Sequence, residues 1–226
     1  MTQRLLSMKK LFVLLAVTAV AFLKCSQQPE VIKDLNLYNK HVQSNPDMEL
    51  VDLKKHIPDA VFDVRYATKN NFTGEIIYDS PIAFARLPVA EALIEVQDSL
   101  KKVGLTLVFF DAYRPYSATV KFYEVYPDKR FVAHPKDGSR HNRGCAVDIS
   151  LADASDGTYL EMPTEFDDFT DRASPDYPDL PEHVKENRDF LIDIMSDHGF
   201  SVYPNEWWHF DFNGWEKYPL MDIIPE

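Results

Sequence analysis

Cysteine is nearly absent from this sequence of 226 residues, in which only Cys25 and Cys145 occur. Two cysteines cannot build the framework of several disulfides that stabilises many small exported domains. Glycine is also scarce, with 7 residues against 15 prolines, so long flexible or low-complexity stretches are not expected. We therefore expect a fold that rests on its hydrophobic core, for which 45% hydrophobic residues in a chain of this length suffice.

Positive charge is in short supply as well. The chain has 24 Lys and Arg residues against 36 Asp and Glu, which gives a formal net charge of -12 at pH 7. Proteins that bind nucleic acid need a concentration of Lys and Arg to neutralise phosphates. The composition therefore excludes a nucleic-acid partner, and no segment of the sequence predicts a protein partner.

An apolar run near the start of the chain is too short to span a bilayer. Residues 11–23, LFVLLAVTAVAFL, follow the positive stretch Met-Lys-Lys at 8–10. A membrane-spanning helix needs about 20 apolar residues, whereas the apolar part of a signal peptide has about 7–15. We expect residues 1–25 to be a signal peptide that exports the protein to the periplasm or cell envelope.

Cys25 follows this apolar run almost at once, and the arrangement resembles the lipidation site of bacterial lipoproteins. The resemblance implies a lipid anchor at Cys25. Ordinary signal-peptide cleavage nearby and an uncleaved anchor are the alternatives. In each case the only expected contact with the membrane is through this N-terminal segment.

The remaining sequence predicts one folded domain over residues 46–226, preceded by a polar, loosely packed tether over 26–45. Apolar residues spaced three and four apart predict helices over 85–105 and 181–200, and a shorter helix is expected over 116–126. Apolar and β-branched runs predict strands at 105–114, 144–151, 200–203 and 206–212. Helices and strands do not alternate regularly, so we predict an α+β domain with a mostly antiparallel sheet flanked by helices.

The segment SRHNRGCAVDIS, residues 139–150, carries Asp148 inside an apolar strand pattern. A buried carboxylate without a partner costs several kcal/mol, so Asp148 needs a cation, a hydrogen-bond network or a metal. Judged alone, a pairing with arginine or backbone amides is the commoner explanation for such an aspartate. His141, in the preceding loop, is by itself more often a surface or packing residue than a ligand.

The segment EWWHF, residues 206–210, places Glu206 and His209 around two tryptophans. An aromatic core strand with polar edges is one explanation. A metal ligand, His209, with a nearby general base, Glu206, is the other. Residues three apart lie on opposite faces of a regular strand, so this second explanation requires a turn or bulge near residues 204–206.

Taken together, the two segments meet the requirements of a catalytic zinc site. Such sites commonly use three protein ligands and leave a position open for water. His141, Asp148 and His209 provide this number, and Glu206 lies beside one of them. Cys145 is a rival ligand, but its position beside Ala146 in the strand favours a small buried thiol.

Five segments, in order, now identify a family. SRHNRGCAVDIS and EWWHF resemble the S-x-H-x-x-G-x-A-x-D and E-x-W-H elements of the D-alanyl-D-alanine dipeptidases, the VanX-like branch of the M15 zinc DD-peptidases. YATKNNFTG (66–74), DAYRP (111–115) and FDDFTDRAS (166–174) are similar to its other motifs. The resemblance covers roughly residues 50–215 and implies a DD-peptidase/Hedgehog-like fold.

The resemblance also implies a role for each residue that matches a motif. One Zn²⁺ per chain would be held by His141, Asp148 and His209, with Glu206 as general base and acid. Arg114 would stabilise the oxyanion of the transition state; without the resemblance, a salt bridge to Asp111 or Glu124 would be favoured. Substrate contacts are implied for four residues: Tyr66, Asp111, Ser139 and Asp171. Asp111 and Asp171 are candidates for binding the substrate ammonium or for orienting Arg114, and Tyr78 is not chosen as a substrate residue.

The implied activity is zinc-dependent hydrolysis of the dipeptide D-alanyl-D-alanine to D-alanine in the cell envelope. Two alternatives remain for an active enzyme: a DD-carboxypeptidase or an endopeptidase that acts on peptidoglycan. A zinc-binding module without catalysis and a purely structural envelope lipoprotein are the alternatives from other classes. The presence of both Glu206 and Arg114 favours catalysis.

Overall fold

A five-stranded sheet forms the centre of the protein in the computed structural model, which describes residues 29–81 and 83–224. Its strands are β3 (Val61–Phe62), β5 (Leu105–Asp111), β6 (Ala146–Asp153), β8 (Glu206–Phe212) and β7 (Phe200–Tyr203), in that spatial order. The β5–β6, β6–β8 and β7–β8 pairs are antiparallel, and β3 pairs with β5 in parallel. The predicted α+β domain with a mostly antiparallel sheet is confirmed, with this single parallel edge pair.

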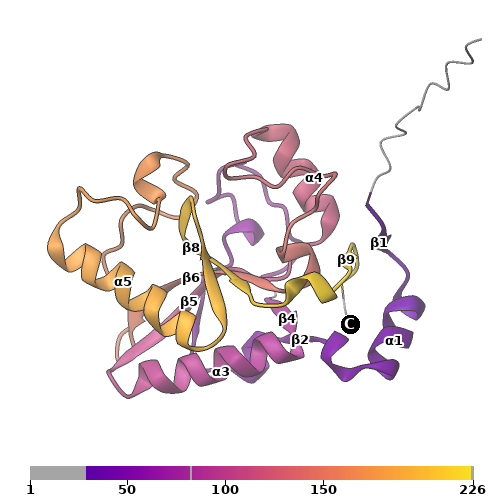
Figure 1. The fold of residues 1–226 in the computed structure, drawn as a ribbon, viewed down its shortest axis with the longest axis horizontal. Helices are drawn as coiled ribbons and strands as arrows, with labels where there is room; N and C mark the ends of the chain where they lie inside the picture. Colours follow the sequence, from indigo (N-terminus) through magenta and orange to yellow (C-terminus); the bar gives the residue numbers. More distant parts are fainter. Residues whose placement is uncertain (1–28, 82, 225–226) are drawn as a thin grey trace, which may run out of the picture.

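Helices lie around the central sheet, apart from the first, which lies to one side of it (Figure 1). They are α1 (Leu35–Ser44), α2 (Leu53–His56), α3 (Leu87–Lys101), α4 (Tyr116–Val125) and α5 (Glu182–Asp197). Two small sheets join β1 (Val31–Ile32) to β9 (Leu220–Met221) and β2 (Leu50–Asp52) to β4 (Phe84–Arg86). Short 3-10 helices lie at η1 (Pro46–Met48), η2 (Arg65–Ala67), η3 (His141–Arg143), η4 (Asp171–Ala173) and η5 (Trp215–Lys217).

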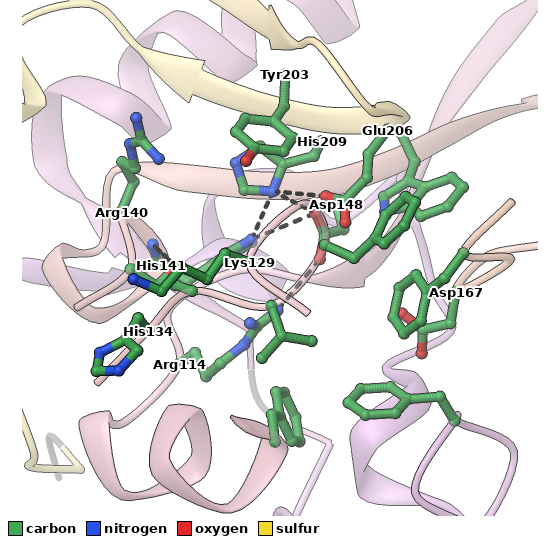
Figure 2. A pocket seen from close by; sticks show the side chains of 18 of the residues that line it. Arg114, Lys129, His134, Arg140, His141, Asp148, Asp167, Tyr203, Glu206 and His209 are labelled. Carbon is green, nitrogen blue, oxygen red and sulfur yellow. Dashed lines mark hydrogen bonds and ion pairs between the residues drawn. The ribbon is translucent and has the colours of Figure 1, made fainter. Parts of the chain in front are cut away.

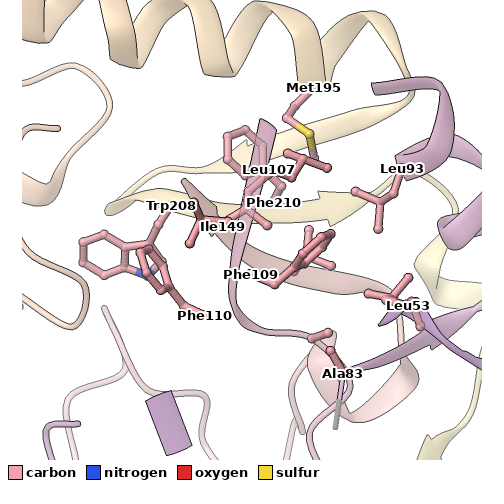
Figure 3. Packing of buried hydrophobic residues seen from close by; sticks show 14 of the residues in the cluster. Leu53, Ala83, Leu93, Leu107, Phe109, Phe110, Ile149, Met195, Trp208 and Phe210 are labelled. Atoms are coloured by element: carbon pink, nitrogen blue, oxygen red, sulfur yellow. The ribbon is translucent and has the colours of Figure 1, made fainter. Parts of the chain in front are cut away.

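The main core lies on one face of the central sheet, between the strands and helices α3 and α5. Side chains alternate between the two faces of a strand, so Ile149 of β6 and Phe210 of β8 point to the opposite face from Asp148 and His209. Ile149 and Phe210 belong to one buried cluster with Met195 of α5 and Leu93 of α3 (Figure 3). The opposite face carries the polar residues Asp148 and His209, and aromatic side chains such as Tyr66 and Phe122 pack around them.

The long helices follow their apolar patterns. Val89, Leu93, Val96 and Leu100 of α3 are all fully buried, as a spacing of three and four requires. Pro88 lies in the first turn of this helix, where its missing N–H costs nothing. Helix α3 ends before Gly104, which has a positive φ of 78°. The predicted helices and strands are confirmed to within a few residues at their ends.

The lead-in over residues 26–45 differs from the sequence prediction, because most of it is folded against the domain. Strand β1 pairs in parallel with β9, and the Tyr38 hydroxyl of α1 accepts a hydrogen bond from the Leu50 N–H at 2.7 Å. Ile32 and Tyr38 are buried in a second, smaller core together with Tyr113 and Met221. The prediction failed because this segment is mostly polar and only a few of its side chains are buried. The strand with which it pairs also lies far away in the sequence, near residue 220.

The expected signal peptide, residues 1–25, and the expected lipidation site at Cys25 lie outside the described residues. Among the residues that the structure describes, no helix combines the length and the apolar composition needed to cross a bilayer.

Candidate active site

Three polar residues form a row across the sheet, on the face opposite the main core. Asp111, at the end of β5, pairs with Asp148 of β6, and Asp148 pairs with His209 of β8. The first pairing depends on a register shift between Phe109 and Asp111, where one extra residue is accommodated in β5. This bulge turns Asp111 to the same face as Asp148, because a shift of one residue reverses the face of a side chain.

A second irregularity brings Glu206 to the same place. Val202 of β7 pairs with Phe210, but the next residue, Tyr203, pairs with Glu206, so the register shifts at the start of β8. The Glu206 carboxylate consequently lies on the same side as His209, with Oε2 at 3.7 Å from Nδ1. The bulge that the sequence required near residues 204–206 is present.

His141 reaches the row from outside the sheet. It begins the 3-10 helix η3, which is capped by Gly144 with φ of 72°, two residues before β6 begins. Its backbone carbonyl accepts a hydrogen bond from the Arg114 N–H at 3.1 Å. A side chain at Gly144 would meet Leu50 Cδ2 at 2.6 Å, so glycine is required both by the left-handed conformation and by the close packing.

The donor atoms of His141, Asp148 and His209 form a compact triangle (Figure 2). Nε2 of His141 lies 3.1 Å from Nδ1 of His209, and Oδ1 of Asp148 lies 3.3 Å and 3.1 Å from these two nitrogens. Ligands about 2.0–2.1 Å from a tetrahedral metal would be about 3.3 Å apart. All three residues are buried. The spacing fits three corners of a tetrahedral metal site.

The hydrogen bonds behind the triangle orient both imidazole rings. Nδ1 of His141 donates to the carbonyl oxygen of Ala112 at 2.7 Å, and Nε2 of His209 donates to the Asp211 carboxylate at 2.9 Å. When both rings are neutral, Nε2 of His141 and Nδ1 of His209 therefore each carry a lone pair, and these lone pairs face each other. Asp148 Oδ1 is buried and lacks a hydrogen-bond partner among the described residues. Two nitrogen lone pairs and a carboxylate oxygen that face one point favour a positive charge there, and a metal ion can accept all three donors at once.

Arg114 approaches the triangle from the end of β5. Its Nε and Nη2 lie 2.9 Å and 2.8 Å from the Asp111 carboxylate, and Nη2 lies 3.4 Å from Asp148 Oδ2. The guanidinium carbon lies over the ring of Phe122 at 4.8 Å. Although burial lowers the pKa of Arg114, Asp111 raises it well above its usual value, so the guanidinium stays charged. Arg114 makes the salt bridge to Asp111 and also lines the cleft.

Comparison with known proteins decides the family. The family model of the D-Ala-D-Ala dipeptidases, peptidase M15, matches residues 46–221. The chain belongs to the M15 family of D-Ala-D-Ala dipeptidases. The relationship implied by the five motifs is thereby confirmed, and with it the class of the protein, a metallopeptidase.

Curated relatives of the same family are matched over nearly their whole length. A D-alanyl-D-alanine dipeptidase of Escherichia coli (strain K12) is 35% identical over 173 residues, which are 76% of this chain and 89% of the relative. One from Enterococcus faecalis is 29% identical and covers 70% of this chain and 88% of its own. The solved structure of VanYB with D-alanine-D-alanine is 15% identical, covers 60% of this chain and 75% of its own, and has a TM-score of 0.40, too distant to add to the assignment.

The cleft of this M15 peptidase has a volume of about 270 Å³ above the triangle. Aromatic residues line one side, with Tyr66, Phe72 and Phe122 in contact with one another. Ser139 lines the cleft as well, and its hydroxyl oxygen accepts a hydrogen bond from the His141 N–H at 3.2 Å. The structure therefore brings Tyr66 and Ser139 to the site.

The surroundings of Glu206 change the acidity of its carboxyl group. Burial raises its pKa to about 8, and the negative charges of Asp148 and Asp167 act in the same direction, whereas His209 lowers it. A carboxyl group with a pKa near neutrality can both accept and donate a proton at physiological pH. These properties are those of a general base and acid.

Asp171 is not at the site, in contrast to the prediction from the FDDFTDRAS motif. Its side chain is 95% exposed and comes no closer than 4.0 Å to Arg130. Asp167, four residues earlier, lines the cleft instead, with a left-handed φ of 63° and one oxygen accepting from the Tyr66 hydroxyl at 2.9 Å. Its other oxygen is buried without a hydrogen-bond partner among the described residues, and burial raises its pKa to about 7. Spacing within an irregular loop could not distinguish these aspartates.

Asp111 lies behind Arg114 and does not itself line the cleft. Its carboxylate accepts from Arg114 on one oxygen and from the Tyr78 hydroxyl on the other, at 2.9 Å. Of the two roles considered for Asp111, the structure supports that of orienting Arg114. Tyr78 contacts Asp111 and does not line the cleft. Cys145 is buried, and burial raises the pKa of its thiol to about 12, so it is neither a ligand of the triangle nor a ready nucleophile.

Proposed function

We propose that the protein hydrolyses the dipeptide D-alanyl-D-alanine to two molecules of D-alanine, using one zinc ion per chain. The observation that carries this proposal is the buried triangle of His141, Asp148 and His209 with Glu206 and Arg114 at the same cleft. The names of the relatives, D-alanyl-D-alanine dipeptidase, support the choice of substrate.

Zinc suits a site of two imidazoles and one carboxylate, and when bound it would activate a water molecule and polarise the scissile carbonyl group. Glu206 accepts the proton of the attacking water and then delivers it to the departing amine. Arg114 presents a fixed positive charge toward the carbonyl oxygen as negative charge develops there. Asp111 holds the guanidinium in this orientation before the substrate arrives.

The two ends of the dipeptide need different partners. The free carboxylate oxygen of Asp167, buried in the cleft wall, suits the substrate ammonium group. Ser139 lies near the triangle and can hydrogen-bond the other terminus, and the aromatic wall around Tyr66 suits a methyl side chain. This arrangement favours a small zwitterionic peptide.

The proposal is tested by dipeptide hydrolysis with the Glu206→Gln variant, with and without chelator. We expect kcat to fall by about 10²–10⁴-fold, the contribution typical of a general base, while the metal content stays at one ion per chain. Glu165→Gln, which changes an exposed carboxylate in the long loop after β6, is the matched control and should keep full activity. Undiminished hydrolysis by Glu206→Gln would refute the mechanism. Cleavage of longer wall peptides but not of the free dipeptide would refute the substrate.

We further propose that the enzyme is exported and acts in the cell envelope, where it would meet dipeptide released from cell-wall material. The support is the positive and apolar N-terminal sequence that ends at Cys25. A reporter fused after residue 40 should be found outside the cytoplasm, and replacing Cys25 by alanine should release it from the membrane fraction if the cysteine carries lipid. A reporter that stays in the cytoplasm would overturn export.

A further inference from the structure

Asp211 lies two residues after His209 on β8, at a position that none of the family motifs includes. Alternation along a strand places residues two apart on the same face. The Asp211 Oδ1 atom accepts the hydrogen bond from Nε2 of His209 at 2.9 Å, on the side of the ring away from the triangle. The Asp211 side chain is only 13% exposed. It is therefore a largely buried carboxylate with one oxygen committed to a proposed metal ligand.

Arg140 faces the second oxygen of this carboxylate. Its buried Nε lies 3.5 Å from Asp211 Oδ2, an ion pair without a hydrogen bond, and within residues 29–81 and 83–224 no other carboxylate is paired with Arg140. The guanidinium carbon lies 4.8 Å from the ring centre of Trp215 and 5.9 Å from that of Tyr203. Stacked in this way, Arg140 has little freedom to move away from Asp211. Arg140 also directly precedes His141, so its ion pair with Asp211 links the start of η3 to strand β8, and these elements carry two of the three donors.

We propose that Asp211, held by Arg140, is a positioning residue that fixes the tautomer and orientation of His209 as a metal ligand. The inference rests on the proposed metal site. A carboxylate behind a ligating imidazole keeps the proton on the outer nitrogen, orients the ring and strengthens the inner nitrogen as a donor. Arg140 contributes through its ion pair with the second oxygen of the Asp211 carboxylate. Asp211 does not line the cleft, whereas Arg140 is one of its lining residues.

Zinc affinity, measured by competition with a chromogenic chelator, tests the inference without reference to turnover. Loss of such a partner typically weakens metal binding by about 10–100-fold. We expect Asp211→Asn, which keeps the shape and loses the charge, to lie near the lower value and Asp211→Ala near the upper one. Arg140→Gln should weaken binding by a smaller factor. In the Asp211→Ala background Arg140→Gln should have no further effect, because Arg140 acts through Asp211.

Two control variants separate positioning from a general loss of structure. Arg143 also lies over the ring of Trp215, at 5.3 Å, but in the described part of the chain it forms no ion pair with Asp211. Asp153 is a carboxylate at the far end of β6. Arg143→Gln and Asp153→Asn should leave zinc affinity within about twofold of the parent, and thermal unfolding of each metal-free variant reports any structural damage.

The possible results distinguish this inference from the proposed function. Unchanged zinc affinity in both Asp211 variants would overturn the positioning role. A loss of affinity matched by Arg143→Gln, or an additional loss from Arg140→Gln in the Asp211→Ala background, would overturn the link from Arg140 to His209. If His209→Ala binds zinc as tightly as the parent, the proposed metal site itself fails.

Discussion

Two histidines in this protein present different ring nitrogens to the same carboxylate oxygen. His141 uses Nε2 because its Nδ1 donates to Ala112, and His209 uses Nδ1 because its Nε2 donates to Asp211. In each ring, the nitrogen that carries the proton is fixed by a partner that can only accept a hydrogen bond. This partner is a carbonyl group for His141 and a carboxylate for His209. The preference for a cation between them is thus built into the fold by backbone and neighbouring side chains.

Metal binding should therefore compete with a proton on His209. Burial lowers the pKa of this imidazole, but the carboxylates of Asp211 and Asp148 override burial and raise the pKa to about 10 in the metal-free protein. Below that pH the ring is protonated, and a metal must displace the proton. We expect zinc affinity to rise about tenfold per pH unit between pH 7 and 9, measured by chelator competition.

Glu206, whose pKa is raised to about 8, would add its own pH dependence over the same range. The Glu206→Gln variant removes this contribution and isolates the proton of His209. A zinc affinity that does not change with pH in this variant would contradict the protonation of His209.

Asp167 and Asp171 provide a direct test of substrate recognition. Asp167→Asn removes the buried charge proposed to bind the substrate ammonium, and charged hydrogen bonds are worth about 1.5–3 kcal/mol. We expect kcat/KM for the dipeptide to fall by about 10–100-fold, mainly through KM. Asp171→Asn changes only an exposed side chain and should remain within about twofold. If steady-state kinetics show a larger loss of kcat/KM for Asp171→Asn than for Asp167→Asn, Asp171 rather than Asp167 binds the substrate ammonium group.

At the level of secondary structure, two bulges and one glycine assemble the site. The register shifts in β5 and at the start of β8 turn Asp111 and Glu206 toward the row of Asp148 and His209. Gly144 allows η3 to end abruptly and β6 to begin, so that His141 can lie over the sheet. Without the two register shifts, Asp111 and Glu206 would point to the opposite face of the sheet.

Gly144→Ala should therefore be unusually damaging. A left-handed conformation costs roughly 1–2 kcal/mol for a residue with a Cβ atom, and the added methyl group would also overlap Leu50 at 2.6 Å, with an overpacking cost of about 1–3 kcal/mol. Gly157→Ala is the matched control, because its φ is 74° and no heavy atom of the described residues lies within 4 Å of the place that its methyl group would occupy. Denaturant unfolding should show a larger loss of stability for Gly144→Ala, and equal losses would show that packing against Leu50 is unimportant.

The sequence predicted the structure correctly where apolar residues repeat with a helical period, or where the proposed chemistry requires particular side chains to meet. The buried face of α3 was predicted from the spacing of its apolar residues. The irregularity near Glu206 was predicted because Glu206 and His209 are three residues apart and must both face the same metal site. Asp167 was missed because it lies in a loop with several aspartates, where a left-handed residue rather than a pattern determines the position. Strand β1 was missed because two residues carry no pattern and their partners, at 220 and 221, are far away along the chain.

At the scale of the whole molecule, the described ends of the chain meet next to the catalytic region. Strands β1 and β9 pair, and the Tyr113 hydroxyl donates to the carbonyl oxygen of Ile223 at 2.8 Å and accepts from the Ile223 N–H at 3.2 Å. Tyr113 directly precedes Arg114, so this second core supports the backbone that delivers the arginine. The N-terminal segment is thus part of the enzyme domain as well as its connection to the proposed export signal.

The proposed metal would connect three separate parts of the chain, because its donors come from η3, β6 and β8. A ligand that binds only the folded state stabilises it by RT ln(1 + [L]/Kd), about 4 kcal/mol when free zinc is a thousandfold above its Kd. For a domain of this size 1 kcal/mol corresponds to about 2–4 °C, so zinc should raise the unfolding temperature by about 8–16 °C. Chelator should reverse the shift in the parent and have no effect on His209→Ala. Because the metal-free variant lacks one donor but keeps both cores, its unfolding temperature should lie near that of the chelated parent, and a zinc-dependent shift in His209→Ala would place the stabilising ion elsewhere in the protein.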